Sequence, residues 1–198
     1  MDYRVVGWLL TYSLVFLWSA IGPRDYFTWI LEVSPAVIAL ALLWFSYQSF
    51  RLTGLVYVLI LLHCIVLMVG GHYTYAEVPL FSPEMLGGER NNYDKIGHFM
   101  QGFVPAMVAR EILLRLQVVN SKRWMEFFVV SICLAFSALY EMIEWGVAVL
   151  SGTSADAFLG TQGYVWDTQS DMGWALAGAI TALLCLSYYH DKQLSNLD

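Results

Sequence analysis

Charged residues are scarce in this chain. Only 13% of its 198 residues are Asp, Glu, Lys or Arg, whereas about a quarter are charged in an ordinary soluble domain. Hydrophobic residues make up 59% of the sequence, and a soluble fold of this length has too little interior to bury them all. The deficit of charge excludes a soluble globular domain and indicates a single integral membrane domain over residues 1–198.

Cysteines and basic residues are also few, and each shortage excludes a class of protein. Cys64, Cys133 and Cys185 stand alone in apolar runs without a Cys-x-x-Cys spacing, so we expect packing thiols and no disulfide framework. The formal net charge is −6, which argues against nucleic acid as a partner. The apolar runs are too long for strands and do not alternate with polar residues, so no strand is expected.

Long apolar runs dominate the sequence instead. A helix needs about 20 mainly apolar residues to cross a bilayer, and six segments meet this requirement. We therefore predict an all-α fold, a polytopic membrane helix bundle with about six transmembrane helices. The expected helices cover residues 5–21, 28–47, 54–71, 94–116, 125–150 and 167–189. The first has a poor small-residue cleavage pattern, so we interpret it as a retained membrane helix rather than a signal peptide.

The distribution of Lys and Arg predicts which side of the membrane each end of the bundle faces. With six spans and both termini in the cytoplasm, seven basic residues lie inside and three outside, as the positive-inside rule favours. The inner residues are Arg4, Arg51, Arg110, Arg115, Lys122, Arg123 and Lys192, and the outer ones are Arg24, Arg90 and Lys95. The acidic residues are concentrated at the outer face, around two long loops at 72–93 and 151–166.

Three of the expected helices each carry a close pair of potential metal ligands towards the outer face. The pairs are Asp94 and His98 at i, i+4, Glu141 and Glu144 at i, i+3, and Asp167 and Asp171 at i, i+4. Both spacings place the two side chains on one helical face. Two of these helices begin at the outer face and the third ends there, so we expect all three pairs to share one layer.

Carboxylates and imidazoles are ligands for Mg²⁺, Mn²⁺, Fe²⁺ and Zn²⁺, and helix bundles hold metals through inward Glu and His pairs. We therefore expect the six residues to bind a divalent metal ion, whose identity and nuclearity stay open. Glu141 or Glu144 would remain free as a catalytic general base, and His72 would protonate a leaving group. Glu32 either joins this layer or pairs with Arg24.

Simpler interpretations of these residues stand beside the metal site. Asp94 and Asp167 lie at helix starts, where an Asp caps free N–H groups and complements the helix dipole. His98 alone can be a hydrogen-bonded packing residue. Glu141 and Glu144 are harder to explain in this way, because an acid at the centre of a membrane helix costs about 2.5–3.5 kcal/mol on insertion scales. Shared protons are the alternative to a cation.

Four blocks of the sequence resemble a known family. Between residues 72 and 180 the chain reads HYTYAEVPLF, RNNYDKIGHFMQGFVPAMVARE, ALYEMIEW and GTQGYVWDTQSDMGWALAGA. These blocks are similar to the signature blocks of the YjdF-type bacterial inner-membrane proteins, an uncharacterised family. The short DKIGHF is similar to an element of the VanZ-like membrane proteins, which are associated with glycopeptide-antibiotic resistance. The resemblance implies a multi-pass protein of the inner membrane and no particular reaction.

Three functions remain open from the sequence. The leading hypothesis is a membrane-embedded metal-dependent enzyme, a hydrolase or transferase, whose outer-leaflet site acts on a phospholipid or cell-envelope lipid intermediate. The second is a proton- or cation-coupled transporter, although the polar layer lies at one face only. The third is a structural or partner-binding membrane protein in which the acids only cap helices and form pairs. The oligomeric state is also left open.

Overall fold

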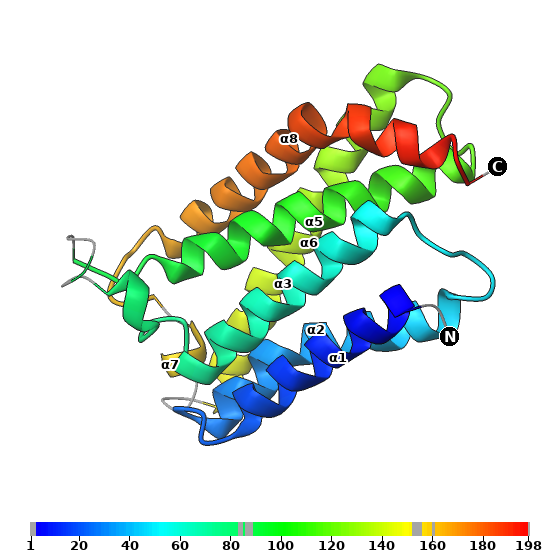
Figure 1. Cartoon of the computed structure of the whole chain (residues 1–198). Coiled ribbons are helices and arrows are strands. Elements are labelled where there is room, and N and C mark those ends of the chain that lie inside the picture. Colours follow the sequence, from blue (N-terminus) through cyan, green and yellow to red (C-terminus); the bar gives the residue numbers. More distant parts are fainter. Residues whose placement is uncertain (1–2, 83–84, 86–88, 152–155, 160, 198) are drawn as a thin grey trace.

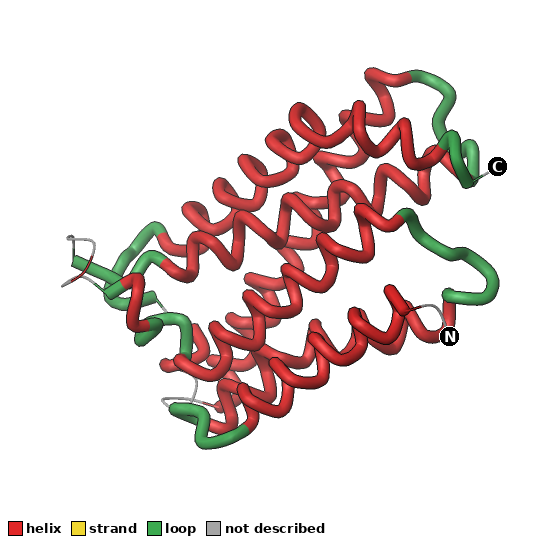
Figure 2. Tube along the Cα trace, viewed as in Figure 1, coloured by secondary structure: helices red, strands yellow, loops and turns green. Residues whose placement is uncertain are grey.

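The computed structural model describes residues 3–82, 85, 89–151, 156–159 and 161–197. Within these residues the chain is helical and contains no strand (Figure 2). The elements are α1 (Tyr3–Ala20), α2 (Tyr26–Ser46), α3 (Gly54–Tyr73), the 3-10 helix η1 (Pro79–Phe81), α5 (Tyr93–Arg115), α6 (Lys122–Ser151), α7 (Asp156–Leu159) and α8 (Asp167–Leu194). Each of the six expected segments overlaps one long helix over almost all its length, so the all-α prediction is confirmed.

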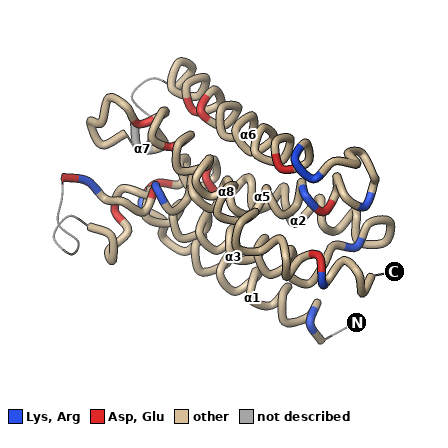
Figure 3. Tube along the Cα trace, turned by 90° about the horizontal axis from the view of Figure 1, so that it is seen from above, with Lys and Arg blue, Asp and Glu red and all other residues tan. Residues whose placement is uncertain are grey.

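The six long helices lie alongside one another and run alternately up and down (Figure 1). Both termini lie at one end, together with the connections 47–53 and 116–121, and we call this the terminal end. The turn 21–25, η1 and α7 lie at the opposite end, which we call the loop end. Basic residues gather towards the terminal end (Figure 3). The placement of both termini in the cytoplasm follows from the positive-inside rule and stays a prediction.

The outside of the bundle suits lipid. Large apolar side chains such as Phe45, Leu150 and Leu184 are highly exposed, and so much apolar surface is not tolerated on a water-soluble monomer. Four of the described helices, α2, α3, α6 and α8, are long and apolar enough to cross a membrane. The more polar α5 packs against α3, α6 and α8. The protein is therefore a helical membrane bundle with a polar helix inside it.

Two glycines allow α5 and α8 to approach each other closely. A Cβ added at Gly102 would lie 1.8 Å from the carbonyl oxygen of Ala175, and one at Gly178 would lie 2.0 Å from the carbonyl oxygen of Phe99. Any side chain at either position would therefore collide with the backbone of the partner helix. Small residues permit this kind of contact between membrane helices, and here the contact brings the polar ends of α5 and α8 together.

An apolar layer separates the two ends of the bundle. Its members are buried, and they include Ile60, Val104, Met107, Cys133 and Ala179. These residues come from α3, α5, α6 and α8, so the layer extends through the middle of the bundle. Polar groups lie in clusters on either side of it.

The polar cluster on the terminal side is saturated with hydrogen bonds. The fully buried Glu111 accepts bonds from the backbone N–H of Thr53 at 2.9 Å and from its hydroxyl at 2.7 Å. Glu111 also lies 3.0 Å from Nε2 of His190, whose Nδ1 is 2.9 Å from Arg110. Arginine can only donate, so Nδ1 of His190 accepts and Nε2–H donates to Glu111. This cluster clamps the start of α3 to α5 and α8.

Candidate metal centre

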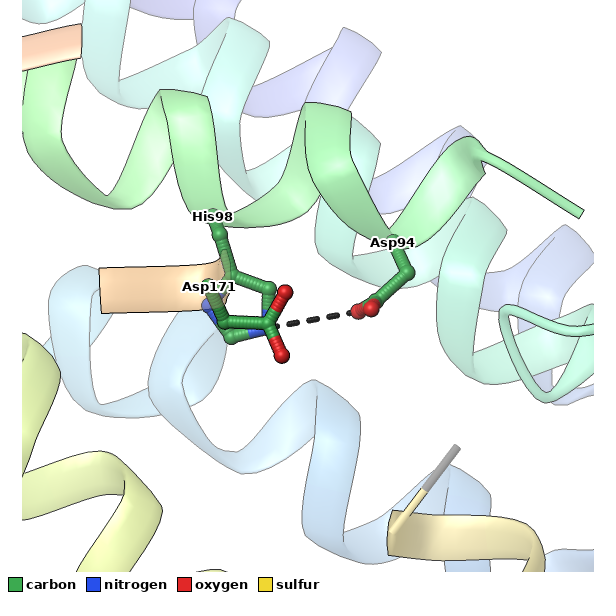
Figure 4. A group of neighbouring side chains, drawn as sticks. All are labelled: Asp94, His98 and Asp171. Carbon is green, nitrogen blue, oxygen red and sulfur yellow. Dashed lines mark ion pairs between the residues drawn. The ribbon is translucent and has the colours of Figure 1, made fainter. Parts of the chain in front are cut away.

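Asp94, His98 and Asp171 come together on the loop side of the apolar layer (Figure 4). One ligand atom from each lies within 4.8 Å of the other two. Nε2 of His98 is 3.2 Å from Oδ1 of Asp94 and 3.8 Å from Oδ2 of Asp171. Asp94 and His98 project from successive turns of α5, as their spacing predicted, and Asp171 reaches them from α8. The close contact of these two helices thus assembles a mixed carboxylate and imidazole cluster.

The orientation of His98 suits metal binding. Its Nδ1 lies 3.1 Å from Oε1 of Gln101, one turn further along α5. An Nδ1–H that donates to this oxygen leaves the Nε2 lone pair directed at Asp94 and Asp171. Histidines that bind metals are held in this way, because the bond on the second nitrogen fixes both the tautomer and the ring orientation.

Two buried carboxylate oxygens in this region have no hydrogen-bond partner within the described part of the chain. They are Oδ1 of Asp171 and Oε1 of Glu141. Asp171 is only 3% exposed and Glu141 only 9%. A buried acceptor without a partner costs free energy, and a nearby cation removes that cost for a carboxylate. The residues present therefore fit a bound metal ion.

Arg90 brings a positive charge to the cluster, which was not predicted from the sequence. Its Nη1 donates to Oδ1 of Asp167, and its Nη2 donates to Oδ2 of Asp94 at 3.1 Å. The guanidinium thus connects the first turns of α5 and α8, and it lies over the ring of Tyr164. From the sequence, Arg90 was predicted only to be one of the three basic residues at the outer face. Its spacing of four residues from Asp94 was the available signal, since that spacing favours an ion pair.

The two predicted glutamates approach the cluster from α6. Glu141 interacts electrostatically with His98 and Asp94, and Glu144 borders a cavity that Asp94 and His98 also line. Of the six predicted ligands, Asp94 and Asp171 contact Nε2 of His98, and no direct contact of either glutamate with His98 is found among the described residues. Asp94, His98 and Asp171 form the compact group of ligand atoms.

His72 lies away from this cluster. Its Nδ1 is 3.0 Å from the carbonyl oxygen of Ser19, and its ring centre is 4.7 Å from that of Trp18 in α1. It does not line the cavity. The geometry gives no support to the predicted role of His72 as a proton donor to a leaving group, and that role stays a prediction.

The cavity beside the cluster has a volume of about 80 Å³. Five helices contribute to its wall, with Asp94 and His98 from α5, Glu32 from α2, and Tyr140 and Glu144 from α6. The hydroxyl of Tyr140 donates to Oε2 of Glu32 at 3.2 Å. Glu32 therefore joins the polar layer, which was one of its two expected positions. A small ligand in this cavity would lie against the candidate metal ligands on α5.

Comparisons with known proteins agree with a membrane bundle. Residues 4–192 match the family described as "Predicted membrane protein (DUF2238)". Over 187 residues the chain is 50% identical to the inner membrane protein YjdF of Escherichia coli (strain K12). This match covers 93% of this chain and 90% of that protein. No solved structure matches the chain. The resemblance of the four sequence blocks to YjdF-type proteins is confirmed and extends over nearly the whole bundle.

Proposed function

The chain belongs to the DUF2238 family of predicted membrane proteins, and we propose that this multi-pass inner-membrane protein is a metal-dependent enzyme acting on an amphiphilic lipid. One observation carries the proposal. Asp94, His98 and Asp171 bring three ligand atoms within 4.8 Å of one another, and a buried oxygen of Asp171 has no partner in the described residues. Metal ligands arranged next to a cavity are typical of a catalytic site.

The balance of charge favours a cation at this cluster. Arg90 already pairs with both Asp94 and Asp167, so it does not compensate the charge of Asp171 or Glu141. His98 supplies at most one positive charge, and it is shared between Asp94 and Asp171. A divalent ion would relieve the remaining repulsion. A mixed oxygen and nitrogen ligand set suits Zn²⁺, Mn²⁺ or Fe²⁺ better than Ca²⁺.

The residues around the centre have distinct roles in this proposal. A divalent ion bound there supplies Lewis acidity towards a phosphoryl or acyl oxygen and lowers the pKa of water. Glu144 lines the cavity, and in this proposal it takes a proton from an attacking water molecule. Arg90 holds Asp94 and Asp167 in position. The apolar layer below the centre keeps water from the rest of the bundle and confines the reaction to one side.

Transport receives less support than catalysis. A path for protons or cations would have to join the centre to the terminal end, and the buried layer that includes Val104, Met107 and Ala179 lies between them. The cluster around Glu111 beyond this layer has its hydrogen bonds satisfied. A purely structural role is less favoured because one oxygen each of Asp171 and Glu141 has no hydrogen-bond partner among the residues that the structure describes.

The first experiment measures bound metal and then product. Elemental analysis of protein purified in mild detergent should find about one equivalent of a transition metal. The same analysis of an Asp94→Asn, Asp171→Asn double variant should find none. The metal-loaded protein is next incubated with total membrane lipid, and products are identified by mass spectrometry. A Glu144→Gln variant should retain the metal and form no product. A wild-type protein that takes up no metal under any loading condition contradicts the proposal.

A further inference from the structure

We infer that the cavity beside the metal centre binds the primary ammonium group of an amphiphile. Because this assignment names the substrate class for the proposed function, it rests on that function for its chemistry. The residues that line the cavity support binding of the ammonium group independently of any reaction. The wall combines carboxylates, one of them buried, with phenol rings and a small apolar patch, and each of these points to the same ligand chemistry.

Three acidic side chains contribute to the cavity wall. Glu32 and Glu144 line the cavity together with Asp94, and no Lys or Arg is among its described lining residues. A phosphate or carboxylate ligand would therefore meet like charges here, whereas a cationic group would be stabilised by them. The histidines His63 and His98 are the sole basic side chains among the described lining residues, and His98 is engaged by the aspartates.

Glu32 keeps a hydrogen-bond acceptor free inside the cavity wall. It is only 6% exposed, and its Oε2 accepts a bond from Tyr140 at 3.2 Å. Its other oxygen, Oε1, has no partner within the described residues. The basic residue nearest in sequence does not neutralise it, because Arg24 pairs with Glu77 at 2.9 Å. A buried carboxylate with one open oxygen is a binding group for a donor from outside the protein.

Tyr75 is inserted into the wall by unusual backbone geometry. Thr74 and Tyr75 both adopt the left-handed conformation, with φ of 56° and 55°, which costs free energy for residues with a side chain. The Tyr75 ring fills the space that a Cβ would occupy at Gly70, 2.2 Å away, and at Gly97, 2.8 Å away. Two glycines and a strained turn thus place an aromatic ring beside the carboxylates. Aromatic faces and carboxylates together recognise ammonium groups.

The hydrogen-bond acceptors in the cavity wall indicate which kind of ammonium group binds. A primary ammonium has three N–H donors, and Glu32 and the phenol oxygens of Tyr75 and Tyr140 can accept them. A quaternary ammonium has no donor and would leave these acceptors without partners. The cavity volume of about 80 Å³ also favours the smaller group. Leu67 and Phe158 in the wall suit the methylene groups next to it.

The test compares lipid headgroups on the metal-loaded protein by native mass spectrometry. Phosphatidylethanolamine should be retained about tenfold or more over phosphatidylcholine and phosphatidylglycerol, as expected for a charged hydrogen bond. Phosphoethanolamine in solution distinguishes the source: weak binding shows that the acyl chains are needed, and strong competition shows that the amine alone is recognised. Equal retention of the three lipids overturns the inference without requiring any variant.

Variants separate this inference from the proposed function. Glu32→Gln should abolish the headgroup preference and leave the bound metal unchanged, whereas Glu126→Gln, at an exposed acid near the start of α6, should change neither. Asp171→Asn should lose the metal and keep the preference for phosphatidylethanolamine. A wild-type protein that binds metal but shows no headgroup preference contradicts the ammonium assignment and leaves the proposed function standing. A wild-type protein that prefers phosphatidylethanolamine but binds no metal contradicts the proposed function and leaves the ammonium assignment standing.

Discussion

Replacement of Asp171 by Asn is the sharpest test of the metal centre. The change removes one of three ligand atoms that lie within 4.8 Å of one another, and it keeps the volume of the side chain. Loss of a residue that merely supports a ligand weakens metal binding by about 10- to 100-fold. Loss of a ligand itself should therefore weaken binding by about 100-fold or more, equivalent to about 2.7 kcal/mol.

Thermal unfolding with and without metal reads this loss directly. At a metal concentration of about 100 times Kd the wild type gains about 2.7 kcal/mol, and a 100-fold weaker variant gains only about 0.4 kcal/mol. For a chain of this size the midpoint should rise by about 5–11 °C in the wild type and by about 1–2 °C in the variant. The metal-free variant should be at least as stable as the metal-free wild type, because a neutral amide is less costly to bury than a carboxylate.

A matched control is available on the same helix. Asp191→Asn is the same substitution at the terminal end of α8, where the side chain is 59% exposed and pairs with Arg110. Any stability that this control loses should be the same with and without metal. An equal metal-induced rise in wild type and Asp171→Asn would refute the assignment of Asp171 as a ligand. A metal-free Asp171→Asn protein that unfolds far earlier than wild type would show instead that the carboxylate is a structural partner.

Three further predictions concern the scaffold. Gly102→Ala should lower the free energy of unfolding by about 3 kcal/mol or more, because the added Cβ would lie 1.8 Å from the carbonyl oxygen of Ala175. Gly146→Ala should leave the thermal midpoint unchanged or raise it, because its Cβ would meet no described atom within 4 Å. Equal losses in the two variants would contradict the close packing of α5 on α8. Glu111→Ala should lower the free energy of unfolding by about 3–5 kcal/mol, because it leaves buried donors without a partner; a loss below about 1 kcal/mol in denaturant titrations would contradict the clamp. Asp25→Ala should cost about 0.5–2 kcal/mol by removing the N-cap of α2. The hydrogen bond that this carboxylate accepts from a backbone N–H lowers the pKa of Asp25. Its stabilising effect is therefore present above the unfolded pKa and is lost as the pH falls through the lower folded pKa. The difference in thermal midpoint between wild type and variant should narrow only below about pH 4, and a difference that narrows near neutral pH would contradict the capping role.

Much of the fold could be predicted from the sequence because the signal for a membrane helix is local. The length of an apolar run decides whether a segment can span a bilayer, and this needs no knowledge of its neighbours. The pairing of Asp94 with His98 was equally local, because a spacing of four residues puts two side chains on one helical face. The resemblance of the motif blocks to YjdF-type proteins added the location but no chemistry.

The position of His72 shows where sequence reasoning stops. Its place at the end of α3 put it at the correct end of the bundle, but it contacts Ser19 and Trp18 rather than the candidate metal ligands. The rotation of a membrane helix about its own axis cannot be predicted from hydrophobicity, since the residues that face lipid and those that face the core are both apolar. The same ambiguity left two positions open for Glu32, and only the structure shows that it meets Tyr140 of α6.

The sequence by itself determined that this is a helical membrane protein with a layer of acids and histidine near one face, because run length, helical spacing and basic-residue bias are properties of the chain alone. Only the tertiary structure decided which of these residues meet. Gly102 lets α5 approach α8 and thereby brings Asp171 to His98, and Arg90 is drawn to Asp167, 77 residues away in the chain. These contacts depend on which helices are neighbours and on how closely they pack, and that information arises only when the whole bundle assembles.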